Sequence, residues 1–144
     1  MANIVTTTKL SENVNEVVFA FHLQYVDTGD ESAQLKVDVS TLEPNSNGDA
    51  CTGVKILECT WVISTMTVQV LADADTDVIM LHLTENQSGY VDFRSVGGLP
   101  NTKTLGTNPT GNIKFTTTGL GAAGDSYQIV MRLKKKYSWQ LQEQ

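Results

Sequence analysis

The sequence predicts an all-β protein, a single antiparallel β-sandwich of about eight strands with a jelly-roll-like or Ig-like arrangement. Apolar residues recur at every second position in several segments, which is the period of a half-buried strand. Turn-forming residues separate these segments at intervals of about ten residues, as they do in sandwiches. No segment carries a sustained helical period. The 144 residues, 40% of them hydrophobic, provide for one core and therefore one domain.

The N-terminal third of the chain predicts two strands and a loop. Alternate residues from Val17 to Tyr25 share one face of the first strand. The segment DTGDES supplies Asp and Gly, which favour a reversal of the chain. A return strand follows in QLKVDVSTL, with Leu35, Val37 and Val39 on its apolar face. Residues 43–53 then form a predicted loop, because Pro, Gly, Asn and Asp dominate there.

The middle of the chain predicts three more strands. Residues 54–64 alternate less regularly, which predicts a bulge near Leu57. Residues 66–72 alternate well, with Met66, Val68 and Val70 on one side. The segment DVIMLHLT is apolar on both faces, and we therefore expect a central strand that is covered on two sides.

The C-terminal third combines short strands with a long loop. GYVDFRSV predicts a short strand, and residues 97–111 lack apolar periodicity, so they predict a long loop of the kind that is functional or held by a partner. The last pair lies in NIKFTTT and SYQIVMRLKKK, with Tyr127, Ile129, Met131 and Leu133 facing inward. We thus divide the chain into an N-terminal arm (1–14), a sandwich (15–136) and a C-terminal tail (137–144).

Charge and cysteine content exclude several classes of protein. The net charge of −6 repels nucleic acid, so direct binding to it is not expected. No run is long and apolar enough for a membrane span, and the start lacks the pattern of a secretory signal, which predicts synthesis in the cytoplasm. Cys51 and Cys59 are too few for a disulfide scaffold, and we expect both to stay reduced.

An acidic cluster offers the first candidate site. Asp73, Asp75 and Asp77 stand at alternate positions, a spacing that lets three carboxylates approach one cation. The EF-hand template fails, because Val78 and Thr84 occupy positions that require Gly and Glu. Two interpretations remain: the polar tip of a hairpin, which we favour, or a metal site shared with a neighbouring loop or subunit.

Catalytic patterns are weak. Neither His22 nor His82 has a second ligand at a metal-binding spacing, and no nucleophile motif is present. Glu58 and Asp92 would be the carboxylate pair of a sandwich glycosidase, although nothing selects this pair over others. The sequence therefore predicts a protein that is not an enzyme.

Several motifs occur in an order that is typical of one group of proteins. They are Trp61-x-Ile63, the acidic hairpin 73–77, GYVDFRSVGGL (89–99), GNIKFTTTG (111–119), GDSYQI (124–129) and the opening hairpin VVFAFHLQYVDTGDES. In these segments the chain resembles small virion structural proteins of tailed bacteriophages, particularly marine ones. The resemblance covers residues 14–136.

The resemblance implies a head decoration, or cement, protein that binds the outside of the capsid shell. Its partner would be the major capsid protein, and self-association, with a trimer favoured, is implied as well. No cofactor and no turnover are implied, and the location would be the exterior of the virion after synthesis in the host cytoplasm. Two alternatives stay open: a head–tail or tail component, and a carbohydrate-binding module with Trp61, Tyr90, Tyr137 and Trp139 as candidate platforms.

Candidate partner-binding residues lie at the chain ends and in the long loop. They are Ile4, Val5 and Leu10 in the arm, Leu99 and Leu105 in the loop, and Arg132, Lys134, Lys136, Tyr137 and Trp139 near the C-terminus. The arm is apolar enough to pair as an added strand, or it is a frayed end. The basic, aromatic segment either docks on an acidic neighbour or blocks strand aggregation. Asp92 and Arg94 are expected to pair, within the chain or across a lattice.

Overall fold

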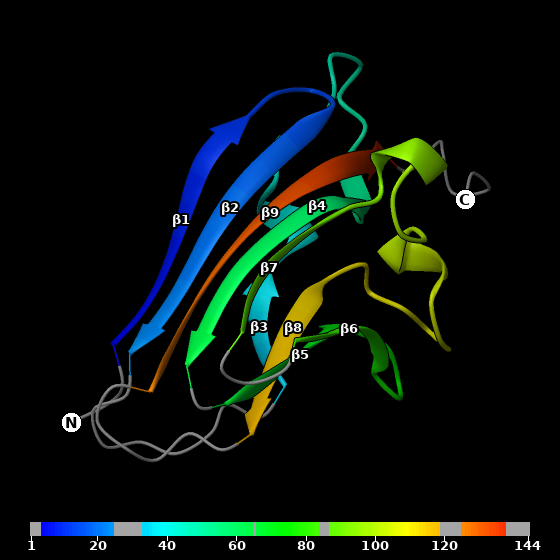
Figure 1. Ribbon diagram of the computed structural model, residues 1–144. Helices are drawn as coiled ribbons and strands as arrows, with labels where there is room; N and C mark the ends of the chain where they lie inside the picture. The colour runs from blue at the N-terminus through cyan, green and yellow to red at the C-terminus, as the bar shows by residue number, and fades with distance from the viewer. Residues whose placement is uncertain (1–3, 25–32, 65, 84–86, 119–124, 138–144) are drawn as a thin grey trace.

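Two antiparallel sheets pack face to face in the computed structural model, which describes residues 4–24, 33–64, 66–83, 87–118 and 125–137 (Figure 1). One sheet has the strand order β1 (Ile4–Glu12), β2 (Glu16–Gln24), β9 (Ser126–Tyr137), β4 (Cys51–Ser64) and β7 (Gln87–Asp92). The other has the order β3 (Gln34–Val37), β8 (Ile113–Thr118), β5 (Thr67–Ala72) and β6 (Val78–Leu83). The predicted all-β sandwich is confirmed.

The strand order is that of a jelly roll. Without β1, the sheets read β2-β9-β4-β7 and β3-β8-β5-β6, so consecutive strands after β1 often lie in opposite sheets. Two interlocked Greek keys give this pattern, and it matches the first of the two expected arrangements. The helices in the described residues are the short 3₁₀ turns η1 (Val39–Thr41), η2 (Arg94–Val96) and η3 (Thr102–Thr104). None of them is long and apolar enough to cross a membrane.

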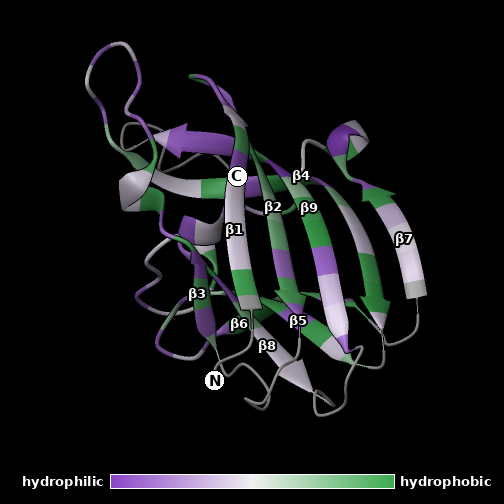
Figure 2. Cartoon of the chain, turned by 90° about the vertical axis from the view of Figure 1, so that its left-hand side faces the viewer, coloured by the Kyte–Doolittle hydropathy of each residue, from purple (hydrophilic) through white to green (hydrophobic). Residues whose placement is uncertain are grey.

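The core lies between the sheets and follows the two-residue alternation. Hydrophobic and hydrophilic bands alternate along β2 and β9 in Figure 2, and the buried residues of β9 include the four predicted to face inward. Phe115 of β8 packs edge-on against Phe21 of β2 and Tyr127 of β9, with ring centroids 5.0 and 5.8 Å apart. Because these rings come from both sheets, they hold the two layers together.

The predicted bulge at Leu57 is present. The register between β4 and β9 shifts between Ile56 and Glu58, so Leu57 is the extra residue. The carbonyl of Leu57 accepts a hydrogen bond from the Phe93 N–H at 2.8 Å, and the carbonyl of Ile56 accepts one from the Leu99 N–H at 2.9 Å. The bulge therefore fixes both ends of the segment that contains η2.

The prediction for residues 78–83 was wrong in one respect. β6 is an edge strand of the four-stranded sheet, not a central strand. Leu99, Pro100 and Leu105 of the long loop lie beside the first half of this strand, where they line an apolar depression together with its residues 78–80. Ile79 remains 55% exposed.

The segment predicted as a separate N-terminal arm is largely part of the sheet. Ile4–Glu12 is β1, which pairs antiparallel with β2 with a register shift between Lys9 and Ser11. Every residue from Val5 to Ser11 is exposed, because the opposite sheet has four strands and leaves β1 uncovered. This strand has no buried face, and so its sequence lacks the alternation that identified the other strands.

Gly111 is needed where the loop returns to β8. Its φ is +87°, and a Cβ at this position would lie 2.0 Å from the Thr52 carbonyl oxygen. Gly48 has a φ of +85° with no atom within 4 Å of its Cβ position. We expect Gly48→Ala to cost about 1–2 kcal/mol of unfolding free energy from backbone strain. Gly111→Ala should lower the unfolding free energy by more, because the backbone at Thr52 must also move to make room for the methyl group. Equal losses of unfolding free energy for the two variants in urea titrations would contradict this prediction.

The two cysteines are free and buried, in agreement with the expectation that they stay reduced. Burial raises the pKa of Cys59 to about 12 and also raises that of Cys51. Since the thiolate is the reactive species, we expect neither thiol of the native protein to react with a thiol reagent at pH 8. Both should react in denaturant, and rapid labelling of the native protein would refute the prediction.

Candidate functional site

The acidic cluster forms the tip of the β5–β6 hairpin. The Asp73 carboxylate contacts the Lys114 Nζ at 2.8 Å and accepts a hydrogen bond from the Thr110 hydroxyl at 2.7 Å. Burial tends to raise the pKa of Asp73, but these two partners outweigh it and the pKa is lowered. Asp77 accepts from the Ala74 N–H at 3.2 Å. The local protein donors thus take up carboxylate oxygens that a cation would need.

The third carboxylate is directed elsewhere. Asp75 accepts a hydrogen bond from the Asn108 side chain at 2.8 Å, and its N–H donates to the Thr107 carbonyl at 2.9 Å. Within the described residues, no group of three or more His, Cys, Asp or Glu side chains could hold a metal ion. His22 lies on β2 and His82 on β6, in different sheets. The hairpin-tip interpretation accounts for the geometry of the cluster.

Leu99 and Leu105, predicted as partner-binding residues, come together at one pocket. They line an apolar depression of about 150 Å³ beside β6, which we call the β6 pocket. Its other lining residues are Val78, Ile79, Met80 and Pro100. The contact between β6 and this loop was not predicted from the sequence, because residue patterns within one segment do not indicate which distant segment lies beside it.

The basic C-terminal segment separates into exposed and buried parts. Arg132 and Lys134 lie on the outer side of β9, with Lys134 exposed. Lys136 and Tyr137 are each 5% exposed, so their prediction as surface partner-binding residues was wrong. β9 extends to Tyr137 and buries it, although the tail was expected to begin there. Trp139 lies outside the described residues, as does the side chain of Ile4.

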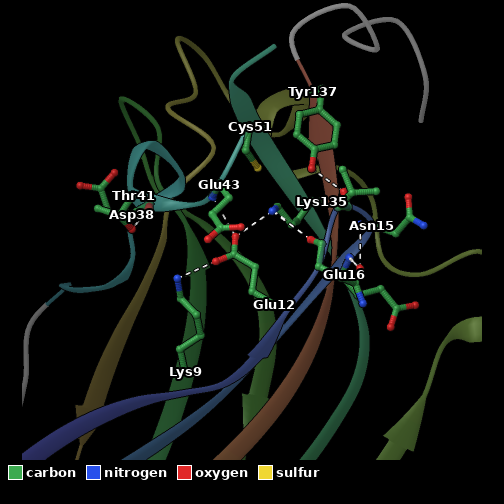
Figure 3. A network of polar contacts seen from close by, with 12 residues as sticks. Lys9, Glu12, Asn15, Glu16, Asp38, Thr41, Glu43, Cys51, Lys135 and Tyr137 are labelled. Carbon is green, nitrogen blue, oxygen red and sulfur yellow. Dashed lines mark hydrogen bonds and ion pairs between the residues drawn. The ribbon is translucent and has the colours of Figure 1, made fainter. Parts of the chain in front are cut away.

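An ion pair that the sequence did not reveal lies beside this segment. The Lys135 side chain is 0% exposed, and its Nζ contacts Glu12 Oε2 at 2.7 Å and the Asn13 carbonyl at 3.1 Å (Figure 3). Glu12 also contacts the Lys9 Nζ at 2.6 Å and accepts from the Glu43 N–H at 2.8 Å. Burial tends to raise the pKa of Glu12, but these donors outweigh it and lower the pKa to about 2. The end of β1 is therefore fastened to β9 and to the loop after η1.

A row of alternating charges crosses the outer face of the five-stranded sheet. Arg94 binds Asp92 through two hydrogen bonds of 3.0 Å, as expected from the sequence, and lies 2.8 Å from Glu58. Arg132 continues the row, 2.8 Å from Glu16 and 3.7 Å from Glu58. Such a row stabilises the sheet surface, with each charge facing an opposite one.

Glu58 and Asp92, the carboxylate pair considered for a glycosidase, are direct cross-strand neighbours. The Arg94 guanidinium lies against both of them. Hydrogen bonds from Arg94 lower the pKa of Asp92, so this carboxyl stays ionised near neutral pH. A general acid needs a raised pKa, and Asp92 therefore does not suit that role.

Comparisons with known proteins give little beyond this geometry. A scan against protein-family models finds no match, and a search of curated proteins finds none. Among solved structures, a cupin superfamily protein from Desulfitobacterium hafniense matches with a TM-score of 0.33 and 12% identity, over 94% of this chain and 80% of that one. A cupin domain from Bordetella pertussis matches with a TM-score of 0.33 and 13% identity, over 94% of both chains.

Proposed function

We propose that the chain is a non-enzymatic structural protein of a phage virion, which decorates or cements the outside of the capsid shell. It would bridge neighbouring subunits of the major capsid protein and act through contact area, without a cofactor. The motif resemblance described above supports this role. The observation that carries it is the exposure of β1, a strand that extends beyond the opposite sheet and offers its outer edge to a neighbour.

β1 has the properties of a contact strand. Val5 is 47% and Leu10 is 56% exposed, and the strand from Val5 to Thr8 contains β-branched residues without charge. An edge of this kind pairs readily with a strand from another subunit. A cement protein needs an interface on the order of 1,000 Å² with the shell, repeated over many copies. β1 contributes one part of such a surface without disturbing the core.

The titratable groups support a structural role over a catalytic one. Among the described residues, the carboxylates of Glu12, Glu16, Glu58, Asp73 and Asp92 each contact a Lys or Arg side chain. Catalysis requires groups that face a substrate in a shared cleft. Glu16 and Arg94 do line a shared depression of about 490 Å³ together with Lys134. Both side chains are engaged there in ion pairs with opposite charges of the sheet surface, which supports a structural role.

Co-sedimentation with undecorated capsid shells tests the proposal. A cement protein should pellet with the shells at a fixed ratio to the major capsid protein and should raise the temperature at which the shells open. Analytical ultracentrifugation of the free protein tests the accompanying proposal of self-association, with a trimer as the expected species. Absence of the protein from the pellet at saturating concentration would refute the decoration role.

A carbohydrate-binding role is the second candidate, and one observation favours it. Tyr90 is 55% exposed on the outer face of the five-stranded sheet, in the same strand as Asp92 and close to Arg94. An exposed ring beside fixed polar groups suits a sugar, which stacks its apolar face and hydrogen-bonds its hydroxyls. Of the other candidate platforms, Tyr137 is buried and Trp61 packs against the core. Binding on a glycan array that Tyr90→Ala abolishes would favour this role.

A further inference from the structure

The β6 pocket combines an apolar depression with a sheet edge. Among the described strands, β6 is hydrogen-bonded to β5 on one side, and its other edge has no strand beside it. The register shifts between Val70 and Leu71, so Met80 is the extra residue of β6 and lies at the pocket. Extended peptides bind such edges through the backbone, while adjacent pockets select their side chains.

The loop wall of the pocket is held in place by buried hydrogen bonds. Thr102 is 0% exposed, and its hydroxyl donates to the Gly111 carbonyl at 2.7 Å and accepts from the Val54 N–H at 3.0 Å. Leu99 is tied to β4 through the bond to the Ile56 carbonyl. A ligand would thus meet a preformed wall and would lose little affinity to ordering it.

Size and charge define the chemistry of the occupant. A depression of about 150 Å³ with an apolar lining accepts one branched aliphatic side chain or a small ring. The strand residues Val78, Ile79 and Met80 carry no charge, whereas the exposed Asp75 precedes them at the hairpin tip. Asp73 and Asp77 face Lys114, but the Asp75 carboxylate has an amide as its described partner. A basic residue on the ligand would complement Asp75.

We propose that the β6 pocket receives an extended, charge-poor segment of a neighbouring capsid subunit, anchored by one branched aliphatic side chain and aligned by a basic residue at Asp75. This inference rests on the proposed function and adds the site of contact and the chemistry of the segment. The occupant lies alongside β6, and its anchor contacts Ile79, Leu99 and Leu105.

Matched surface variants test the site. Ile79 is 55% exposed in the pocket, and Val62 is 58% exposed on the opposite sheet, so Ile79→Asp and Val62→Asp place the same charge on equally exposed strand positions. In co-sedimentation with undecorated shells, we expect Ile79→Asp to weaken binding at least tenfold and Val62→Asp to bind within about twofold of the wild type. Ile79→Thr keeps a β-branched side chain and serves as the test if Ile79→Asp fails to fold. We expect it to weaken shell binding by less than Ile79→Asp and by more than Val62→Asp.

Two further measurements separate a strand contact from a general surface effect. Asp75→Asn should weaken shell binding about two- to fivefold at low salt and have little effect at high salt. Backbone amides of β6 should exchange more slowly with deuterium on shell-bound protein than on free protein, while those of β7 stay unchanged. Failure of the wild type to pellet overturns the proposed function and this inference together. If the wild type pellets with the shells and a folded Ile79→Asp or Ile79→Thr variant binds them equally well, this inference alone is overturned.

Discussion

Replacing Phe115 with alanine is expected to lower the free energy of unfolding by about 3–5 kcal/mol. Phe115 is 0% exposed and contacts the Phe21 and Tyr127 rings from the opposite sheet. The substitution removes the transfer energy of a buried ring and leaves a cavity that the two flanking rings cannot fill without a shift of the sheets. Urea titration followed by tryptophan fluorescence measures the change.

Two controls define the expected result for Phe115. Phe115→Leu keeps most of the buried volume and should cost about 1–2 kcal/mol. Tyr90→Ala removes an aromatic ring that is 55% exposed, and it should change stability by about 0.5 kcal/mol or less. A loss below about 1 kcal/mol for Phe115→Ala would mean that these rings do not join the two sheets.

Replacing Glu12 with glutamine is expected to destabilise the fold by about 3 kcal/mol. The Lys135 ammonium would remain buried, with an exposed fraction of 0% for its side chain and no carboxylate beside it. Lys135→Met in the same chain removes the stranded charge, and the double variant should recover much of the loss. Lys9 lies at the more exposed end of the network, with 39% of its side chain exposed, and Lys9→Met should cost less than about 1 kcal/mol.

The same pair gives the stability a dependence on pH. The pKa of Glu12 is about 2 in the folded protein, against an ordinary value of 4.5. A lowered pKa contributes stability that is fully present above about pH 4.5 and is lost as the pH falls towards 2. The stability difference between the wild type and Glu12→Gln should therefore shrink as the pH falls through this range. A constant difference between pH 7 and pH 2.5 would contradict the ion pair.

Side-chain alternation predicted the parts of the fold in which one face of a strand is buried. Val17, Phe21, Ile129 and Leu133 point into the core as expected, and the irregularity at Leu57 marks a true bulge. In these strands each side chain has one possible environment, so the pattern of residues and the pattern of burial coincide. The expected pair of Asp92 and Arg94 is present, although β7 ends at Asp92 and Arg94 lies in η2 and not in the same strand.

Alternation was misleading where burial depends on distant segments. β6 is apolar on both faces although it is an edge strand. Three residues of the long loop lie beside it at the β6 pocket, and residue type does not distinguish this environment from that of a central strand. β1 has exposed residues on both faces, so it shows no period and resembled an unstructured arm. In β9, Lys135 is buried because it continues the inward face of Leu133, but Lys136 is buried as well, although it stands on the same face as the exposed Lys134.

The candidate site could be predicted only in part. Leu99 and Leu105 were identified as contact residues from the character of the long loop, but their meeting with Ile79 depends on strand order. Gly111 and the buried Thr102, which position that loop, gave a weaker signal, although a glycine between a loop and a strand often marks a close approach of two backbones.

The extra strand outside the jelly roll is secured at Glu12 and lies free of the core along the rest of its length. β1 can separate from β2 starting at its N-terminal end while the ion pair between Glu12 and Lys135 stays formed. No side chain from Val5 to Ser11 would leave a buried position in this local opening. Separation of β1 from β2 would therefore leave the side chains of the core in place.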